Sequence, residues 1–178
     1  MITKNLPLQY CLLISFIILL LSIVGCRKEI EQRFEIPYEV AFDIPAGLDN
    51  FNVHYFDIKN VPTNIDAIVA GNGVTLNDIP AIRPKEFQLT SVLGIDYDFI
   101  YRINIYLFDE TDPANIKEIA YYDEVPLNTS SFLSVQPSLV DAKPFLSKPY
   151  MNVRVRLQLR HPTSEFIESR LRLKFYAE

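Results

Sequence analysis

The stretch Asn152-Val-Arg-Val-Arg-Leu-Gln-Leu-Arg160 (NVRVRLQLR) alternates apolar and polar side chains without a break. Successive side chains of a β-strand point to opposite faces, so a period of two predicts a strand with one buried and one solvated face. After the turn His161-Pro-Thr-Ser164, the alternation returns in Arg170-Leu-Arg-Leu-Lys-Phe175 (RLRLKF). The chain therefore ends in two predicted strands, which we expect to pair as a β-hairpin.

The same pattern recurs towards the N-terminus. Residues 34–44 (FEIPYEVAFDI) place an apolar side chain at every second position, and Pro37 lies among the polar ones. Because proline has no N–H donor, this segment is predicted to be an edge strand or a bulged one. Further strands are expected at residues 51–60, 86–92, 97–108, 116–122 and 132–135. Short helical turns are expected within residues 63–69 and 137–149.

About eight strands, short polar connections and no long segment of 3.6-residue periodicity predict an all-β fold. We expect residues 34–178 to form a single antiparallel β-sandwich, immunoglobulin-like or similar, with one or two short helical turns. The 12 prolines suit such a fold, because they punctuate strand edges and loops.

Six cations occupy polar positions of the two C-terminal strands: Arg154, Arg156, Arg160, Arg170, Arg172 and Lys174. Because their neighbours are apolar, we expect all six to point to one outer face. Such a face could bind an anionic partner, such as lipid headgroups, a phosphorylated polysaccharide or an acidic protein. The alternative is cross-strand ion pairing that only stabilises the sheet. Acids for such pairs are available at Glu35, Glu39, Asp43 and Glu118.

The inventory of catalytic side chains is small. The chain has two histidines, His54 and His161, and two cysteines, Cys11 and Cys26, and it has no tryptophan. Residues 34–178 therefore offer no thiol, and we expect no disulfide, no metal and no cofactor there. No phosphate-binding glycine loop, dinucleotide motif or nucleophilic serine elbow is present.

Two acidic segments leave alternatives open. Residues 109–115 (DETDPAN) carry oxygen ligands suited to calcium, but lack the glycine and the spaced glutamate of an EF-hand loop. Asp96 and Asp98 would form a carboxylate pair for hydrolysis if a cleft brought them together. The formal net charge of −5 argues against nucleic acid as a partner, since binding it normally requires a basic surface.

The N-terminus has a different composition. No charge occurs between Asn5 and Gly25, and residues 11–25 (CLLISFIILLLSIVG) are apolar apart from two serines. Such a segment is long enough to cross a bilayer, and it also fits the apolar core of a secretory signal. Residues 21–26 (LSIVGC) resemble the lipobox of bacterial lipoproteins, in which an aliphatic residue and a small residue precede an obligatory cysteine.

This resemblance implies cleavage after Gly25 and attachment of diacylglycerol and a further acyl chain, such as palmitate, to Cys26. Two or more acyl chains hold a protein stably on a membrane. The chain would then consist of a signal peptide (1–25), a lipidated cysteine with a charged tether (26–33) and a β-domain (34–178). Arg27, in place of the aspartate that retains many lipoproteins in the inner membrane, favours the outer membrane.

The alternative is an uncleaved single-pass anchor. Arg27, Lys28 and Arg33 follow the apolar segment and only Lys4 precedes it, which would favour a cytoplasmic β-domain. On the lipoprotein interpretation, the β-domain is similar to those of small envelope lipoproteins. We then expect a non-enzymatic binding or assembly module, facing the periplasm or the exterior, whose partners are the membrane and another envelope protein or a polysaccharide. An envelope hydrolase that uses carboxylates is the competing hypothesis.

Overall fold

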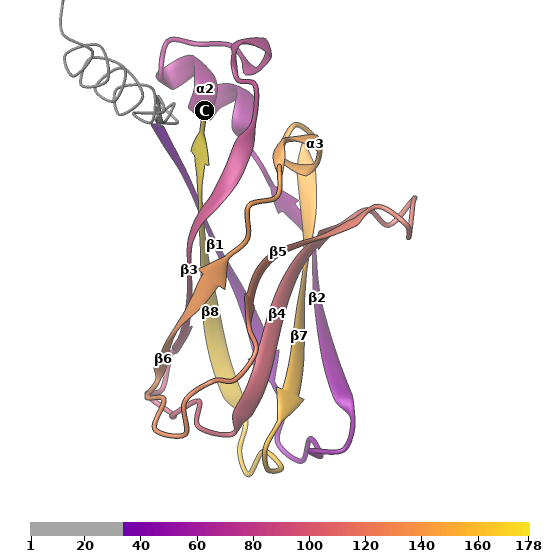
Figure 1. Ribbon diagram of the computed structural model, residues 1–178, viewed down its shortest axis with the longest axis vertical. Helices are drawn as coiled ribbons and strands as arrows, with labels where there is room; N and C mark the ends of the chain where they lie inside the picture. The colour runs from indigo at the N-terminus through magenta and orange to yellow at the C-terminus, as the bar shows by residue number, and fades with distance from the viewer. Residues whose placement is uncertain (1–33) are drawn as a thin grey trace, which may run out of the picture. The chain divides into compact units, whose positions relative to one another are not determined.

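The computed structural model describes residues 34–178, so Gly25 and Cys26 lie outside the described residues. The described chain is nearly all β (Figure 1). Its strands are β1 (Phe34–Ile44), β2 (Val53–Pro62), β3 (Ile82–Ser91), β4 (Ile100–Phe108), β5 (Ile116–Tyr122), β6 (Phe132–Pro137), β7 (Tyr150–Leu159) and β8 (Ile167–Ala177). Its short helices are α2 (Ile65–Gly71), the single 3-10 turn η1 (Leu76–Asp78) and α3 (Lys143–Leu146).

All strand pairs are antiparallel, and the strand order is β1-β8-β3-β6-β5-β4-β7-β2. The order pairs β1 with β8, β2 with β7, β3 with β6 and β4 with β5, as if one long hairpin had been rolled up. This is the topology of a jelly roll. It contrasts with the immunoglobulin domain, in which the first two strands pair.

β6 joins the two halves of the sheet. Its residues Phe132 to Val135 pair with β3, and its last two residues, Gln136 and Pro137, pair with β5. All eight strands therefore belong to one continuous, barrel-like sheet rather than to two separate sheets. The predicted class, an antiparallel all-β fold of about eight strands with short helical turns, is confirmed.

Alternate residues of each strand fill the interior. On β7, Val153, Val155 and Leu157 are fully buried, as the alternation in the sequence predicts. On β8, Phe175 is also fully buried, and its ring meets the ring of Phe87 edge-on with the centroids 5.5 Å apart. Burial of one such side chain stabilises the fold by about 1.5–3 kcal/mol.

β1 and β2 stand at the two ends of the strand order. The prediction that Pro37 marks an edge strand is thus confirmed, because β1 has a neighbour, β8, on one side only.

The predicted hairpin of the last two strands is wrong. β7 pairs with β2 and β4, whereas β8 pairs with β1 and β3. Residues 160–166 carry the chain from one half of the sheet to the other. Alternation specifies which side chains of a strand face the core. Because both halves of the sheet face the same core, alternation does not specify which strand pairs with which.

The strands define two ends of the domain. Phe34, where β1 begins, pairs with Ala177 near the C-terminus, and α2 and α3 lie at this same end (Figure 1). At the opposite end lie four connections, which together we call the loop end: residues 45–52, 92–99, 123–131 and 160–166. Within residues 34–178, no helix combines the length and the apolar character needed to cross a membrane.

Candidate functional site: the loop end

The structure divides the six predicted cations into two groups. Arg154, Arg156 and Arg160 belong to β7 or follow it directly, and Arg170, Arg172 and Lys174 belong to β8. Because β7 and β8 lie in different halves of the sheet, no single face carries all six. Each group meets its own acids or carbonyl oxygens.

The β8 cations pair with acids of the neighbouring strands. Arg170 and Arg172 approach Glu39 of β1 at 3.7 and 3.5 Å, and Lys174 approaches Glu86 of β3 at 2.7 Å. The hydrogen bond to Glu86 raises the pKa of Lys174. Exposed pairs of this kind contribute about 0–1 kcal/mol each. The predicted alternative, cross-strand ion pairing, therefore describes this group.

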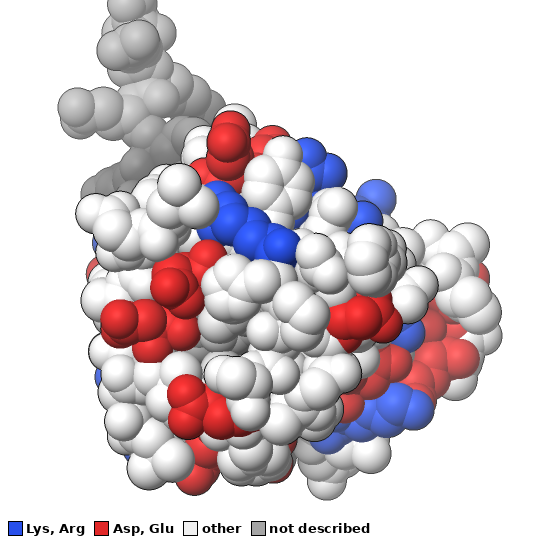
Figure 2. All heavy atoms as spheres, turned by 90° about the horizontal axis from the view of Figure 1, so that it is seen from below, with Lys and Arg blue, Asp and Glu red and all other residues white. Residues whose placement is uncertain are grey.

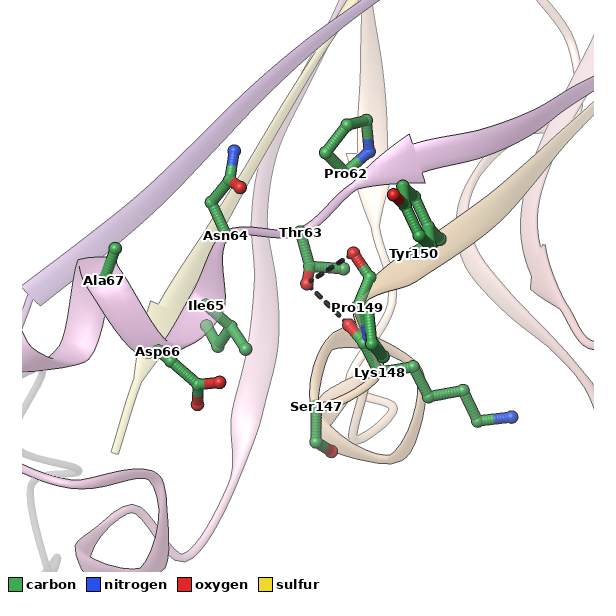
Figure 3. A pocket seen from close by; sticks show the side chains of 10 residues that line it. All are labelled: Pro62, Thr63, Asn64, Ile65, Asp66, Ala67, Ser147, Lys148, Pro149 and Tyr150. Atoms are coloured by element: carbon green, nitrogen blue, oxygen red, sulfur yellow. Dashed lines mark hydrogen bonds between the residues drawn. The ribbon is translucent and has the colours of Figure 1, made fainter.

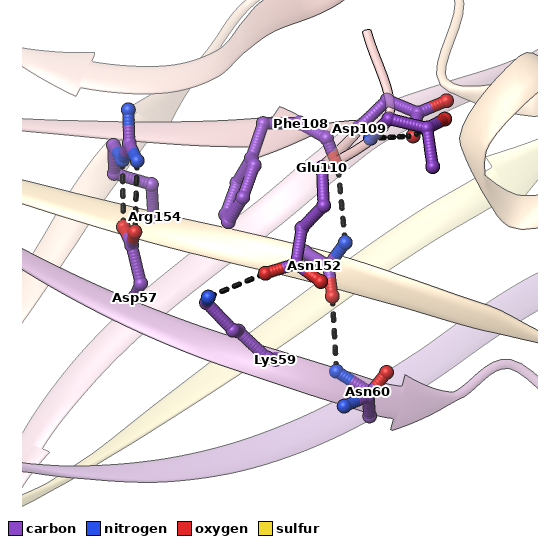
Figure 4. A network of polar contacts seen from close by, with 9 residues as sticks. Asp57, Lys59, Asn60, Phe108, Asp109, Glu110, Asn152 and Arg154 are labelled. Atoms are coloured by element: carbon purple, nitrogen blue, oxygen red, sulfur yellow. Dashed lines mark hydrogen bonds and ion pairs between the residues drawn. The ribbon is translucent and has the colours of Figure 1, made fainter. Parts of the chain in front are cut away.

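Arg154 forms the best-defined ion pair of the β7 group. Its Nε and Nη2 donate to the two carboxylate oxygens of Asp57 at 2.6 and 2.8 Å (Figure 4). The guanidinium also covers the ring of Phe108, 4.7 Å from its centroid. The hydrogen bonds from Arg154 lower the pKa of Asp57. This arginine is therefore held in place by both Asp57 and Phe108.

The same region holds further polar contacts. Lys59 pairs with Glu110, and Asn152 accepts a hydrogen bond from the main chain of Asn60 at 3.0 Å (Figure 4). Nearer the middle of the sheet, Arg156 donates to Asn104 at 2.8 Å, and Asn104 donates to Glu118 at 2.9 Å. Arg156, too, is engaged within the sheet.

One cleft, with a volume of about 390 Å³, lies at the end opposite the loop end (Figure 3). Its wall is fixed by Thr63, whose hydroxyl donates to the carbonyl oxygens of Lys148 and Pro149 at 2.5 and 3.3 Å. The ammonium of Lys148 is paired with Asp109. Asp66 is the one carboxylate among the lining residues, so the cleft holds no carboxylate pair for hydrolysis.

The acidic loop 109–115 is occupied by its own contacts. Asp109 pairs with Lys148 and accepts hydrogen bonds from Thr111, and together these lower the pKa of Asp109 to about 2, with Lys148 the larger cause. Asp112 accepts from the main chain of Ala114 at 3.1 Å. These are turn contacts, and within residues 34–178 no three metal-ligating side chains lie close enough together to hold an ion.

Arg160 makes contacts that join all four connections of the loop end. Its main-chain oxygen accepts a hydrogen bond from Asn50 at 3.0 Å, in the first connection. Its guanidinium donates to the carbonyl oxygen of Asp98 in the second connection, at 3.3 Å, and to that of Val125 in the third. Because Arg160 itself opens the fourth connection, the main chain and side chain of this one residue join all four connections.

A second cleft, of about 190 Å³, opens between residues 92–99 and 160–166. Asp96 and Asp98 both line it, together with Glu165 and His161. The structure thus brings the predicted carboxylate pair to one cleft. The two histidines have different surroundings: His161 lines this cleft, whereas Nε2 of His54 contacts the carbonyl oxygen of Asp49, in the first connection, at 2.7 Å.

Each of the four connections also exposes at least one large apolar side chain. Phe51 is 91% exposed, Leu93 71%, Leu127 74% and Phe166 53%. Sequence reasoning missed this feature. Its only signal was an apolar residue within each turn, as in Asn50-Phe51-Asn52, and single apolar residues on a surface are common.

The loop end is also acidic. It contains six carboxylates, those of Asp49, Asp96, Asp98, Asp123, Glu124 and Glu165, and one arginine, Arg160, for a formal charge of −5 with histidine neutral. Figure 2 shows this end, with acidic side chains scattered among uncharged ones and with a few basic side chains in view. Within the described residues, Asp123 pairs with Arg102 at 3.3 Å, and no ion pair is formed by Asp96, Asp98, Glu124 or Glu165.

No protein-family model matches this chain, and no curated protein matches its sequence. Among solved structures, the chain is similar to one described as the capsid asymmetric unit of cyanophage Pam1, with a TM-score of 0.41 and 10% identity over 81% of this chain and 85% of that one. It is also similar to a chain of turnip yellow mosaic virus, with a TM-score of 0.27 and 10% identity over 82% of this chain and 95% of that one. At these scores, neither similarity carries an argument about the function of this chain.

Proposed function

We propose that this chain is a lipid-anchored protein of the cell envelope whose β-domain acts as a non-enzymatic binding or assembly module. The loop end is the observation that carries this proposal. Four connections, held together by hydrogen bonds, expose an apolar side chain each. Apolar side chains gathered on an exposed surface and bordered by polar groups are typical of interaction sites.

The position of the proposed anchor supports the same function. Residues 27–33 separate Cys26 from β1, which begins at the end of the domain opposite the loop end. β1 has 11 residues and so extends about 36 Å. A lipid on Cys26 would therefore be joined, through residues 27–33, to the end of the β-domain from which β1 begins, and not to the loop end.

A hydrolase is the second candidate, and the cleft lined by Asp96 and Asp98 is the feature that favours it. Both residues are exposed, however, and a general acid is normally kept protonated by an apolar surrounding. Their exposure favours a role in binding.

Mass spectrometry of the N-terminal peptide, from full-length chain extracted from envelopes, tests the anchor. We expect residues 1–25 to be absent and Cys26 to carry acyl chains. Cys26→Ala should prevent lipid attachment, whereas Cys11→Ala, which changes the other cysteine of the apolar segment, should leave it intact. Retention of residues 1–25 with an unmodified Cys26 would instead identify an uncleaved single-pass anchor. Cross-linking in intact envelopes then separates a permanent subunit from a module that binds its partner transiently.

A further inference from the structure

We infer that the loop end docks a protein segment that carries both basic and apolar side chains. This inference rests on the proposed function and specifies the chemistry of the partner. Three properties of the loop end support it: an exposed apolar surface, a preformed backbone and an excess of carboxylates without internal partners.

The apolar surface is the first property. Phe51, Leu93, Leu127 and Phe166 come from four connections that are far apart in the sequence, and the fold brings all four to one end. Aromatic and large aliphatic side chains supply most of the affinity at protein interfaces, because water leaves them when the partner docks.

The preformed backbone is the second property. Thr163 is buried, its main-chain N–H donates to the carbonyl oxygen of Leu48 at 3.0 Å, and its hydroxyl donates to that of Pro45 at 2.8 Å. The N–H of Tyr97 likewise donates to the carbonyl oxygen of Ser130 at 3.2 Å. These bonds join the first connection to the fourth and the second to the third. A surface that is ordered before binding loses less conformational entropy when its partner arrives.

The negative charge of the loop end favours a partner with basic side chains. Asp96, Asp98 and Glu165 line a cleft of about 190 Å³, and their carboxylates form no ion pair within the described residues. The guanidinium of Arg160 is engaged by main-chain oxygens. A lysine or arginine side chain of the partner would find its counter-charges in this cleft, with apolar contacts beside it.

Two other occupants fit the loop end less well. Anionic lipid headgroups would meet a formal charge of −5, so repulsion opposes insertion of the apolar side chains into such a membrane. A second copy docked through the same surface would meet the same like charge. Other surfaces of a second copy offer few free cations, since Arg154, Arg170 and Lys174 are already paired.

Site-specific photo-cross-linking tests the inference in cells that make the full chain. p-Benzoylphenylalanine replaces Leu127 at the loop end or, as a control, Leu139, which is 83% exposed beyond β6 at the opposite end. We expect Leu127 to yield a cross-link to another protein, within a segment that carries more basic than acidic residues together with apolar ones. Asp96→Asn/Asp98→Asn should reduce this cross-link about tenfold, the factor that ~1.4 kcal/mol of lost interaction produces. The matched pair Asp66→Asn/Asp112→Asn, at the opposite end, should leave it unchanged.

A cross-link from Leu127 to lipid, to a second copy or to an acidic segment would overturn the inference. So would the absence of a cross-link from Leu127, or a cross-link that survives Asp96→Asn/Asp98→Asn in full. Mass spectrometry of the N-terminal peptide from the same sample distinguishes failure of this inference from failure of the proposed function. An acylated Cys26 with cross-links from Leu139 alone would leave the proposed function in place, whereas an unmodified Cys26 would remove the lipid anchor.

Discussion

The guanidinium of Arg160 donates a hydrogen bond to the main-chain carbonyl oxygen of Val125, and this contact joins two connections that lie 35 positions apart in the sequence. The same guanidinium donates to the carbonyl oxygen of Ile100 and lies over the ring of Tyr101, 5.5 Å from its centroid. The alternation of the sequence predicted that this arginine belongs to a basic surface. Its contacts instead make it a structural element of the loop end.

Arg160→Met should destabilise the domain, because it leaves part-buried carbonyl oxygens without their charged donor. Loss of a hydrogen bond of this kind costs about 1.5–3 kcal/mol, which denaturant unfolding can measure. The control is Arg170→Met, which removes an exposed pair with Glu39 at 3.7 Å and should change the free energy of unfolding by less than about 1 kcal/mol. Equal effects of the two substitutions would contradict the role assigned to Arg160.

Leu157→Ala tests the alternation in the opening stretch. Leu157 is fully buried, so its truncation should leave a cavity and lower the free energy of unfolding by about 2–5 kcal/mol. Gln158→Ala, one position along the same strand, changes a side chain on the outer face and should cost far less. Urea unfolding of both variants provides the measurement, and a larger effect at Gln158 would contradict the assigned faces.

Stability should fall when the pH drops from about 4 towards 2. The contacts of Asp109 with Lys148 and Thr111 lower its pKa from 3.8 to about 2, and Arg154 lowers the pKa of Asp57. A carboxyl group whose pKa is lowered by folding stabilises the fold at pH values above its pKa in the unfolded chain. This stabilisation is lost as the pH falls through its pKa in the folded protein. Asp109→Asn should therefore make the loss of stability below pH 4 shallower, as thermal melts across the pH range would show. Thr111→Val is the comparison: it removes the hydrogen bond from the Thr111 hydroxyl but keeps the pair of Asp109 with Lys148, so it should change the pH profile less than Asp109→Asn.

The separation of the last two strands can be tested with engineered disulfides, since residues 34–178 contain no cysteine. Glu39 and Arg172 lie opposite each other in the β1–β8 register, at the Cα separation that a disulfide requires. Glu39→Cys/Arg172→Cys should therefore oxidise readily to a disulfide. Arg156→Cys/Arg170→Cys, which a β7–β8 hairpin would bring together, should remain reduced. Non-reducing electrophoresis of tryptic peptides distinguishes the two pairs, and a bond in the second pair would contradict the strand order.

Much of the fold followed from local patterns. Period-two alternation predicted β7 and β8 as strands with their buried residues, and Pro37 predicted an edge strand. These predictions succeeded because they depend on the geometry of a single strand, which every residue pair along it repeats. The pairing of β7 with β8 failed, because the identity of a neighbouring strand depends on contacts between distant parts of the chain.

By itself, the sequence determined that residues 34–178 form an antiparallel all-β domain, which of its side chains face the core and that it offers no thiol chemistry. Only the tertiary structure decided that its C-terminal cations lie in two groups, and that Phe51, Leu93, Leu127 and Phe166 share one end. The physical reason is that alternation orients side chains relative to their own strand. Which connections meet depends instead on the order of the strands in the jelly roll. That order is set by burying the apolar faces of all eight strands at once.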